Sequence, residues 1–158
     1  MHQLLSFFGH VDFGHQLEDK DLLPYAEDAL VFMAVSVNSS WKVPSGYFLI
    51  ASVNAEEKAN LVSLGIKQLH DVGVKVVSFV CDGPPTNLAM LGDLGMCVKP
   101  DNIKSDFSNP ADPDSKIYGM LDCCHMLKLV RNSWSNSRRY GVMHILKKML
   151  TFYITHSR

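Results

Sequence analysis

Apolar residues along the chain gather into short runs of strand length, separated by polar turns and by stretches of helical periodicity. The longest run, 29–37, is rich in β-branched residues and predicts a strand that is buried on both faces. A polar turn at 38–40 leads into 41–50, which predicts a second strand antiparallel to the first. Pro44 within this second strand favours a sheet edge or a bulge. The pattern thus begins with two antiparallel strands.

Helical spacing follows directly after these strands. Asn54, with Glu57 three residues later, is typical of a capped helix start, and Gly73 is a suitable helix end. Between them, apolar residues recur at helical intervals, namely Ala59, Val62, Ile66 and Leu69. The β-branched run 74–80 then predicts another buried strand. The chain therefore passes from antiparallel strands to alternating helix and strand.

The rest of the chain continues this alternation. We expect a short helix capped by Thr86, and a loop over 97–116, where proline and aspartate are frequent. Residues 117–121 predict another buried strand, a helix begins after Asp122, and 142–153 predict a last amphipathic helix. The predicted fold class is therefore α/β, with a mixed β-sheet covered by helices.

The composition is that of an ordinary globular domain. The chain has 158 residues, of which 47% are hydrophobic and 20% are charged, and this excludes a disordered or collagen-like protein. No apolar run reaches the roughly 18–20 residues of a membrane span, and the first residues lack the pattern of a secretory signal. Four cysteines, two of them adjacent, do not form a disulfide framework. We therefore expect a reducing, intracellular environment and no membrane partner.

Charge is divided unevenly along the chain. Residues 1–122 hold all 16 acidic residues and 8 basic ones, whereas residues 123–158 hold 7 basic residues. This division indicates a basic segment that either meets an anionic partner or packs on an acidic body. The candidate contacts to a nucleic-acid backbone are Lys128, Arg131, Arg138, Arg139, Lys147 and Lys148. Trp134 and Tyr140 lie among them and are candidates for stacking on bases. The alternative is a solvated basic face whose aromatic residues pack in the core.

Two aspartates, Asp82 and Asp122, each end a predicted buried strand. Ligands of open α/β sheets bind beyond the carboxyl ends of the strands, and carboxylates gathered there suit Mg²⁺ or Mn²⁺. A pair of such ions stabilises the attacking and leaving oxygens of a phosphodiester. The alternative is structural, because each aspartate can also cap the turn or the helix that follows it.

Other catalytic and metal-binding arrangements find less support. Cys81, Cys123, Cys124 and His125 form no C-x-x-C pair, and adjacent cysteines are poor partners in a tetrahedral zinc site. Cys81 lies within a predicted strand, which favours packing in the core over a role as nucleophile. The glycine-rich phosphate-binding loops of nucleotide-dependent enzymes do not occur in the sequence.

An ordered series of motifs resembles one family across residues 5–133. Its most specific parts are Cys81-Asp82-Gly83 and the segment 121–132, which reads L-D-C-C-H-M-L-K-L-V-R-N. The other matching segments are 29–33, 41–48, 69–77 and 87–91. Together they resemble the RNase H-like domain of P element transposases, and in particular that of the THAP-domain transposases of vertebrates.

The resemblance implies a DDE/D transposase core, in which three acidic residues hold Mg²⁺ or Mn²⁺ for hydrolysis of DNA and strand transfer. Asp82 matches the second of these acids. Asp122 and His125 match a segment that leads, in the family, to a GTP-binding insertion domain. The first acid of the family would lie upstream of this chain, and the insertion domain and the third acid downstream, so bound GTP is not expected. By resemblance, the protein is nuclear and its partner is DNA.

The leading hypothesis is therefore a truncated transposase domain that is catalytically inactive and serves in DNA binding or assembly. Residues 1–133 would form a partial RNase H-like domain, and 134–158 a divergent, basic and helical tail. The alternative is a metal-dependent nuclease or transposase, active with missing segments or a partner chain, or with Asp12, Asp82 and Asp122 as a substitute acidic cluster. Without the family's first strand, the strand before Asp82 would be a sheet edge, open to self-association or to pairing with full-length relatives.

Overall fold

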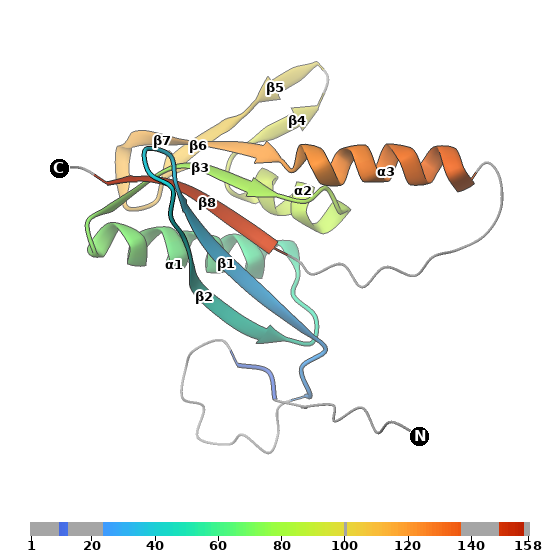
Figure 1. Cartoon of the computed structure of the whole chain (residues 1–158), viewed down its shortest axis with the longest axis horizontal. Coiled ribbons are helices and arrows are strands. Elements are labelled where there is room, and N and C mark those ends of the chain that lie inside the picture. Colours follow the sequence, from blue (N-terminus) through green and yellow to red (C-terminus); the bar gives the residue numbers. More distant parts are fainter. Residues whose placement is uncertain (1–9, 13–23, 100, 137–148, 157–158) are drawn as a thin grey trace.

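A computed structural model describes residues 10–12, 24–99, 101–136 and 149–156 of the chain. Figure 1 shows the arrangement of its helices and strands. In chain order these are β1 (Asp28–Ser36), β2 (Lys42–Ile50), α1 (Ala55–Asp71), β3 (Val74–Cys81), α2 (Pro85–Asp93), β4 (Cys97–Lys99), β5 (Asn102–Lys104), β6 (Asp106–Asn109), β7 (Asp112–Leu121), α3 (Cys123–Asn136) and β8 (Met149–His156).

Six of the strands form one mixed sheet in the order β2-β1-β8-β3-β7-β6, and β4 pairs with β5 in a separate hairpin. β1 and β2 are antiparallel, whereas β3 and β7 are parallel. β8 lies between these two pairs, parallel to β1 and antiparallel to β3. The predicted fold class, an α/β fold with a mixed sheet and covering helices, is confirmed.

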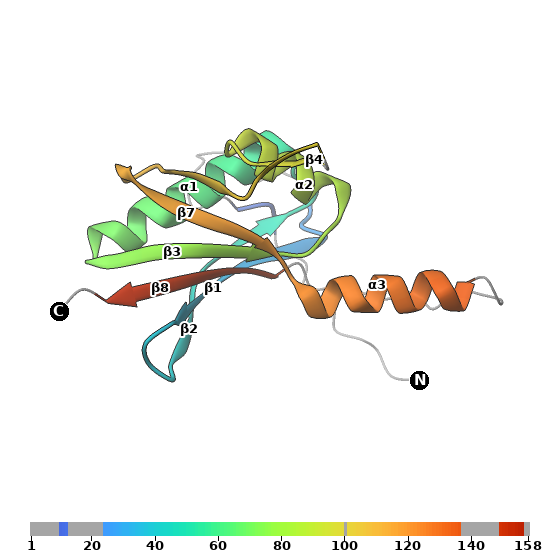
Figure 2. The same ribbon diagram turned by 90° about the horizontal axis from the view of Figure 1, so that it is seen from above.

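The hydrophobic core lies between the sheet and two helices. α1 and α2 lie on the same face of the sheet, as Figure 2 shows. Leu30 and Phe32 of β1 and Phe79 of β3 are buried in one cluster with Val62 and Ile66 of α1. Because every second residue of β1 faces this cluster, the apolar run predicted as a strand supplies one wall of the core.

The two ends of α1 follow from local sequence, as predicted. The Glu57 N–H donates to Asn54 Oδ1 and the Asn54 N–H donates to Glu57 Oε2, both at 2.9 Å, which is a reciprocal capping box. Gly73, just past the helix, has a φ of 78° that favours glycine. The start of α2 differs from the prediction. Pro84 is its N-cap and Thr86 lies within its first turn, so the predicted Thr86 cap is wrong.

Two stretches of the chain differ from the sequence-based expectation. The loop expected over 97–116 contains β4, β5, β6 and the start of β7. Asp101 and Pro110 occupy turns in this stretch, which explains why its composition resembled that of a loop. The helix expected over 142–153 is wrong from Met149 onward, where β8 begins, and residues 137–148 lie outside the described ranges. Pairing with β1 and β3 on both sides outweighs the local helical spacing.

β8 also changes the expected edge of the sheet. It pairs with β3 on one side, while β7 pairs with β3 on the other. The strand that ends before Asp82 is therefore an interior strand, and the predicted exposed edge beside it is wrong for the described part of the chain. The outer strands of the described sheet are β2 and β6.

Candidate metal site at the carboxyl ends of two parallel strands

The carboxyl ends of β3 and β7 lie side by side. The two strands are parallel, with Cys81 opposite Leu121. The backbone N–H of Asp122 donates to the carbonyl of Cys81 at 2.8 Å. Asp82 and Asp122 therefore begin the loops at the same end of the sheet, which is where α/β folds bind ligands.

A buried chain of hydrogen bonds holds the side chain of Asp82. Asn87 Nδ2 donates to Asp82 Oδ1 and, at 3.4 Å, to the Asp82 carbonyl. Asn87 Oδ1 accepts a hydrogen bond from Lys58 Nζ at 2.8 Å, and Lys58 Nζ also donates to Thr86 Oγ1 at 3.1 Å. The exposed fractions are 7% for Asp82, 2% for Asn87 and 3% for Lys58. Three elements, α1, β3 and α2, thus meet at one carboxylate.

The sequence analysis did not identify Lys58 or Asn87. Lysine is among the residues that are least often buried, so Lys58 resembled an ordinary surface residue of α1. The one signal in the sequence is spacing. Lys58 precedes the buried residues Val62 and Ile66 by four and eight positions, and it therefore lies on the apolar face of the helix.

Asp122 has a different setting, at the start of α3. Its Oδ1 accepts hydrogen bonds from the backbone N–H groups of Cys124 at 2.9 Å and His125 at 3.3 Å. These are backbone donors of the first helical turn, which have no partner within the helix. The structural alternative for Asp122, a helix cap, is thus observed, whereas Asp82 is bound by a side chain.

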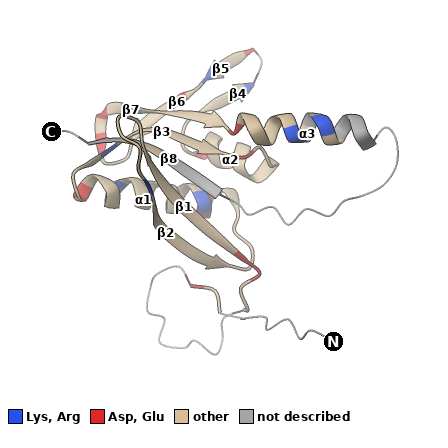
Figure 3. Cartoon of the chain, in the orientation of Figure 1, with Lys and Arg blue, Asp and Glu red and all other residues tan. Residues whose placement is uncertain are grey.

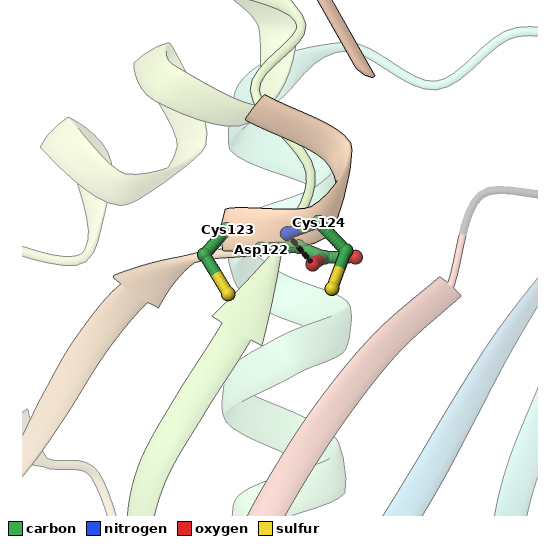
Figure 4. A group of neighbouring side chains, drawn as sticks. All are labelled: Asp122, Cys123 and Cys124. Carbon is green, nitrogen blue, oxygen red and sulfur yellow. Dashed lines mark hydrogen bonds between the residues drawn. The ribbon is translucent and has the colours of Figure 1, made fainter. Parts of the chain in front are cut away.

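Figure 4 shows Asp122, Cys123 and Cys124 gathered at the start of α3. One ligand atom of each lies within 4.8 Å of the others, and both thiols are exposed. Within the described ranges, these three residues are the one group of potential metal ligands that lie this close together, and the group does not include Cys81 or His125. The zinc arrangement of Cys81, Cys123, Cys124 and His125, which the sequence disfavoured, therefore does not form among the described residues.

The pKa values of Cys124 and Cys81, one thiol at each strand end, are both raised, but for different reasons. The adjacent Cys123 raises the pKa of the Cys124 thiol. Burial raises the pKa of Cys81 from 9.0 to about 12, helped by the negative charge of Asp82 and opposed by Lys58. Cys81 is part of the hydrophobic core, which confirms the prediction that it packs there.

Asp12 lies far from Asp82 across the sheet, beyond the outer strand β2. Its backbone pairs with Leu49 of β2, on the side away from β1. Three strands, β2, β1 and β8, separate it from β3. At about 4.8 Å per strand this amounts to on the order of 20 Å. The substitute cluster of Asp12, Asp82 and Asp122 is therefore wrong.

The predicted DNA-contacting residues divide between described and undescribed parts of the chain. Lys128 and Arg131 lie on α3, whereas Arg138, Arg139, Lys147 and Lys148 lie outside the described residues. Figure 3 shows that α3 extends beyond the sheet and carries basic but no acidic side chains. No helix in the described ranges is long and apolar enough to cross a membrane.

Comparison with known proteins identifies the group to which this fold belongs. Residues 2–95 match the family described as TNP-like, RNase H N-terminal domain. The matched segment runs from before β1 to the end of α2, and it includes Lys58, Asp82 and Asn87. The chain belongs to this family. The resemblance to P element transposases that the motifs suggested is thereby confirmed.

This TNP-like RNase H domain has two transposases among its relatives. It is 32% identical to the human DNA transposase THAP9 over 131 residues, which are 83% of the chain and 14% of that protein. It is 31% identical to the Drosophila melanogaster transposable element P transposase over 101 residues, which are 64% of the chain and 12% of that protein. The chain thus spans only a small part of the length of either relative.

A solved structure supports the fold of the TNP-like RNase H domain. The Drosophila P element transposase strand transfer complex matches with a TM-score of 0.51 and 24% sequence identity, over 68% of this chain and 29% of that one. At this identity the match concerns the fold, and it agrees with the observed mixed sheet.

The TNP-like RNase H domain offers one carboxylate in a form that suits a divalent cation. Asn87 engages Asp82 Oδ1, and within the described part of the chain no hydrogen bond reaches Oδ2. Carboxylate oxygens are preferred ligands of Mg²⁺ and Mn²⁺, and Mg²⁺ commonly uses one or two carboxylates and keeps several waters. The described residues therefore fit a single cation at Asp82, with Asp122 at the neighbouring strand end.

Proposed function

We propose that this chain is a P element-type transposase module that carries one metal-binding carboxylate, Asp82, and does not cleave DNA by itself. The setting of Asp82 supports this proposal. The residue ends an interior strand, it is buried, and its carboxylate is held by Asn87. Within the described ranges it belongs to no group of three metal-ligating side chains. Phosphodiester chemistry with two cations needs more ligands than this.

A second candidate function is Mg²⁺- or Mn²⁺-dependent cleavage of DNA in an assembly, where a further segment or a partner chain adds the other carboxylates. The buried Lys58–Asn87–Asp82 network favours this candidate. Burying charged groups costs free energy that an apolar cluster of similar size would not cost. Binding of a cation at the oriented carboxylate, at the carboxyl end of a central strand, would account for this cost.

The proposed partner is DNA and the proposed location is the nucleus. α3 supports this, because Lys128 and Arg131 lie on a helix that carries no acidic residue. In both views α3 extends away from the sheet (Figures 1 and 2). Arg131 is exposed and Lys128 is half-buried, which supports contact with a phosphate backbone.

A cleavage and binding assay tests the proposal. The purified chain is incubated with duplex DNA in Mg²⁺ or Mn²⁺, beside the Asp82→Ala variant. We expect no cleavage by either protein and salt-dependent binding by both. Cleavage by the native chain that the Asp82→Ala variant lacks would show that the second candidate applies without added segments.

The binding arm uses a charge-matched control. Lys128→Ala and Arg131→Ala should each weaken DNA binding and lower the slope of log affinity against log salt by about one. Lys67→Ala removes an exposed lysine of α1 and should leave both quantities unchanged. Equal effects of all three substitutions would exclude α3 as the DNA-binding element.

A further inference from the structure

Lys58 and Asp82 are the two buried charged residues within the described part of the chain. They come from different elements, the first turn of α1 and the end of β3. Two opposite charges removed from water are tolerated when hydrogen bonds compensate their lost hydration. Here Asn87, from the first turn of α2, provides that compensation to both of them.

The chemistry of the two charges determines which way the Asn87 amide must face. A lysine ammonium only donates hydrogen bonds, so the atom that faces Lys58 has to be the amide oxygen. An ionised carboxylate only accepts, so the atom that faces Asp82 has to be the amide nitrogen. The observed contacts, Lys58 Nζ to Asn87 Oδ1 and Asn87 Nδ2 to Asp82 Oδ1, satisfy both requirements. The amide is therefore constrained from both of its ends.

We propose that Lys58 and Asn87 are positioning residues for Asp82. Their relay of hydrogen bonds holds Asp82 Oδ1 and leaves Asp82 Oδ2 to bind a divalent cation. This inference rests on the metal-binding role of Asp82 proposed above. Without Lys58, the amide is held at only one of its two ends, so it is freer to shift and rotate beside the carboxylate. The carboxylate would then rotate or move, and its cation-binding oxygen would no longer be fixed.

Thr86 provides the matched control for this relay. Its hydroxyl accepts a second hydrogen bond from the same ammonium, at 3.1 Å, but does not contact Asn87 or Asp82 in the described interactions. Thr86→Val thus removes one partner of Lys58 and leaves the amide constrained. If Lys58 only stabilised the local structure, Thr86→Val would disturb that role. The relay through Asn87 would not be disturbed.

Two measurements on the full, isotopically labelled chain test the inference by NMR. The first follows, without metal, the exchange of the Asn87 side-chain amide protons with water. We expect slow exchange in the native chain and in Thr86→Val, and exchange at least about tenfold faster in Lys58→Met, because the amide is no longer held. Lys58→Gln keeps an N–H donor and should lie closer to the native chain.

The second measurement titrates Mn²⁺ and follows the broadening of the Asp82 and Gly83 backbone resonances. We expect broadening in the native chain, none in Asp82→Ala, and a need for about tenfold more Mn²⁺ in Lys58→Met and in Asn87→Leu. The double variant of Lys58→Met and Asn87→Leu should bind Mn²⁺ no more weakly than Asn87→Leu alone, because both residues act through one contact. The dispersion of the remaining resonances shows whether each variant is folded. If Lys58→Met does not fold, Asn87→Leu and Lys58→Gln provide the test instead.

The outcomes separate the two proposals. Equal Mn²⁺ affinity in the native chain and in the folded Lys58 and Asn87 variants would overturn the positioning role and leave the metal-binding role of Asp82 intact. Broadening that is absent from the native chain, or unchanged in Asp82→Ala, would overturn the metal-binding role itself. Fast amide exchange in the native chain would overturn the relay whatever the metal does.

Discussion

Asp82 and Asp122 end two neighbouring parallel strands, yet the protein treats them differently. Asp82 is buried, and its carboxylate accepts a hydrogen bond from Asn87 of α2, which is held in turn by Lys58 of α1. Asp122 is bound by backbone N–H groups of the helix that directly follows it. The same topological position thus gives a carboxylate fixed by tertiary contacts in one strand and a helix cap in the other. Position at the end of a strand does not by itself define a metal ligand, whereas the contacts around the carboxylate distinguish the two.

The largest difference between the two strand ends is expected in thiol reactivity. Cys81 is buried and its pKa is raised to about 12, whereas Cys123 and Cys124 are exposed. Because the thiolate is the reactive form, we expect both exposed cysteines to react with iodoacetamide at pH 8 at least about a hundredfold faster than Cys81. Mass spectrometry of timed samples measures this. In denaturant the difference should vanish, and similar rates in the native chain would contradict the buried setting of Cys81.

Removal of each carboxylate should separate their contributions to stability. Asp82→Ala leaves Lys58 and the Asn87 amide buried without their acidic partner, and we expect a loss of about 3 kcal/mol in the free energy of unfolding. Urea denaturation measures it. Asp93→Ala, at an exposed aspartate of α2, is the control and should change stability by less than about 0.5 kcal/mol. A similarly small effect of Asp82→Ala would mean that the network is not stabilising.

Asp122→Ala should have a smaller and more local effect. Loss of a helix cap costs about 1 kcal/mol, and the cost should appear as faster hydrogen exchange of the Cys124 and His125 amides, with little change in β3. Asp122→Asn retains an acceptor oxygen and should preserve most of the protection. Loss of protection throughout the sheet would show instead that Asp122 supports more than its own helix.

The smallest effect is expected at the contact between the two strand ends. A Cβ at Gly83 would lie 2.9 Å from Met126 Sδ of α3. Since a methionine side chain is flexible and Met126 is partly exposed, Gly83→Ala should cost only about 0.5 kcal/mol, less than overpacking of a closed core. Thermal unfolding measures the change, and Met126→Ala in the same chain should remove it. A cost that persists in the double variant would place the strain in the backbone.

Most of the fold up to α2 could be predicted from local patterns, since the information lies within each segment. The apolar run of β1, the capping box of Asn54 and Glu57 and the β-branched run of β3 each specify their element. β8 could not be predicted in this way, because its partners, β1 and β3, lie about seventy or more positions earlier in the sequence. Its residues Thr151, Tyr153 and Ile154 are good strand formers, which is the signal that helical spacing obscured.

The candidate site was predictable only in part. The place of Asp82 at the end of a strand followed from the apolar run before it and from the family resemblance. Its partners did not, because a buried lysine and a buried asparagine depend on how α1 and α2 pack, which no single segment encodes. The cap at Asp122 was foreseeable, since both its acceptor and its donors lie within four residues.

The position of β8 has a consequence for how the protein is made. β8 is the last described element in the chain and yet the strand between β1 and β3. During synthesis, the hairpin of β1 and β2 and the unit of β3 and β7 can form early, but they cannot join in one sheet until residues 149–156 leave the ribosome. Such a late, long-range closure is slow, and it leaves two strand edges open to chaperones or to other nascent chains in the meantime.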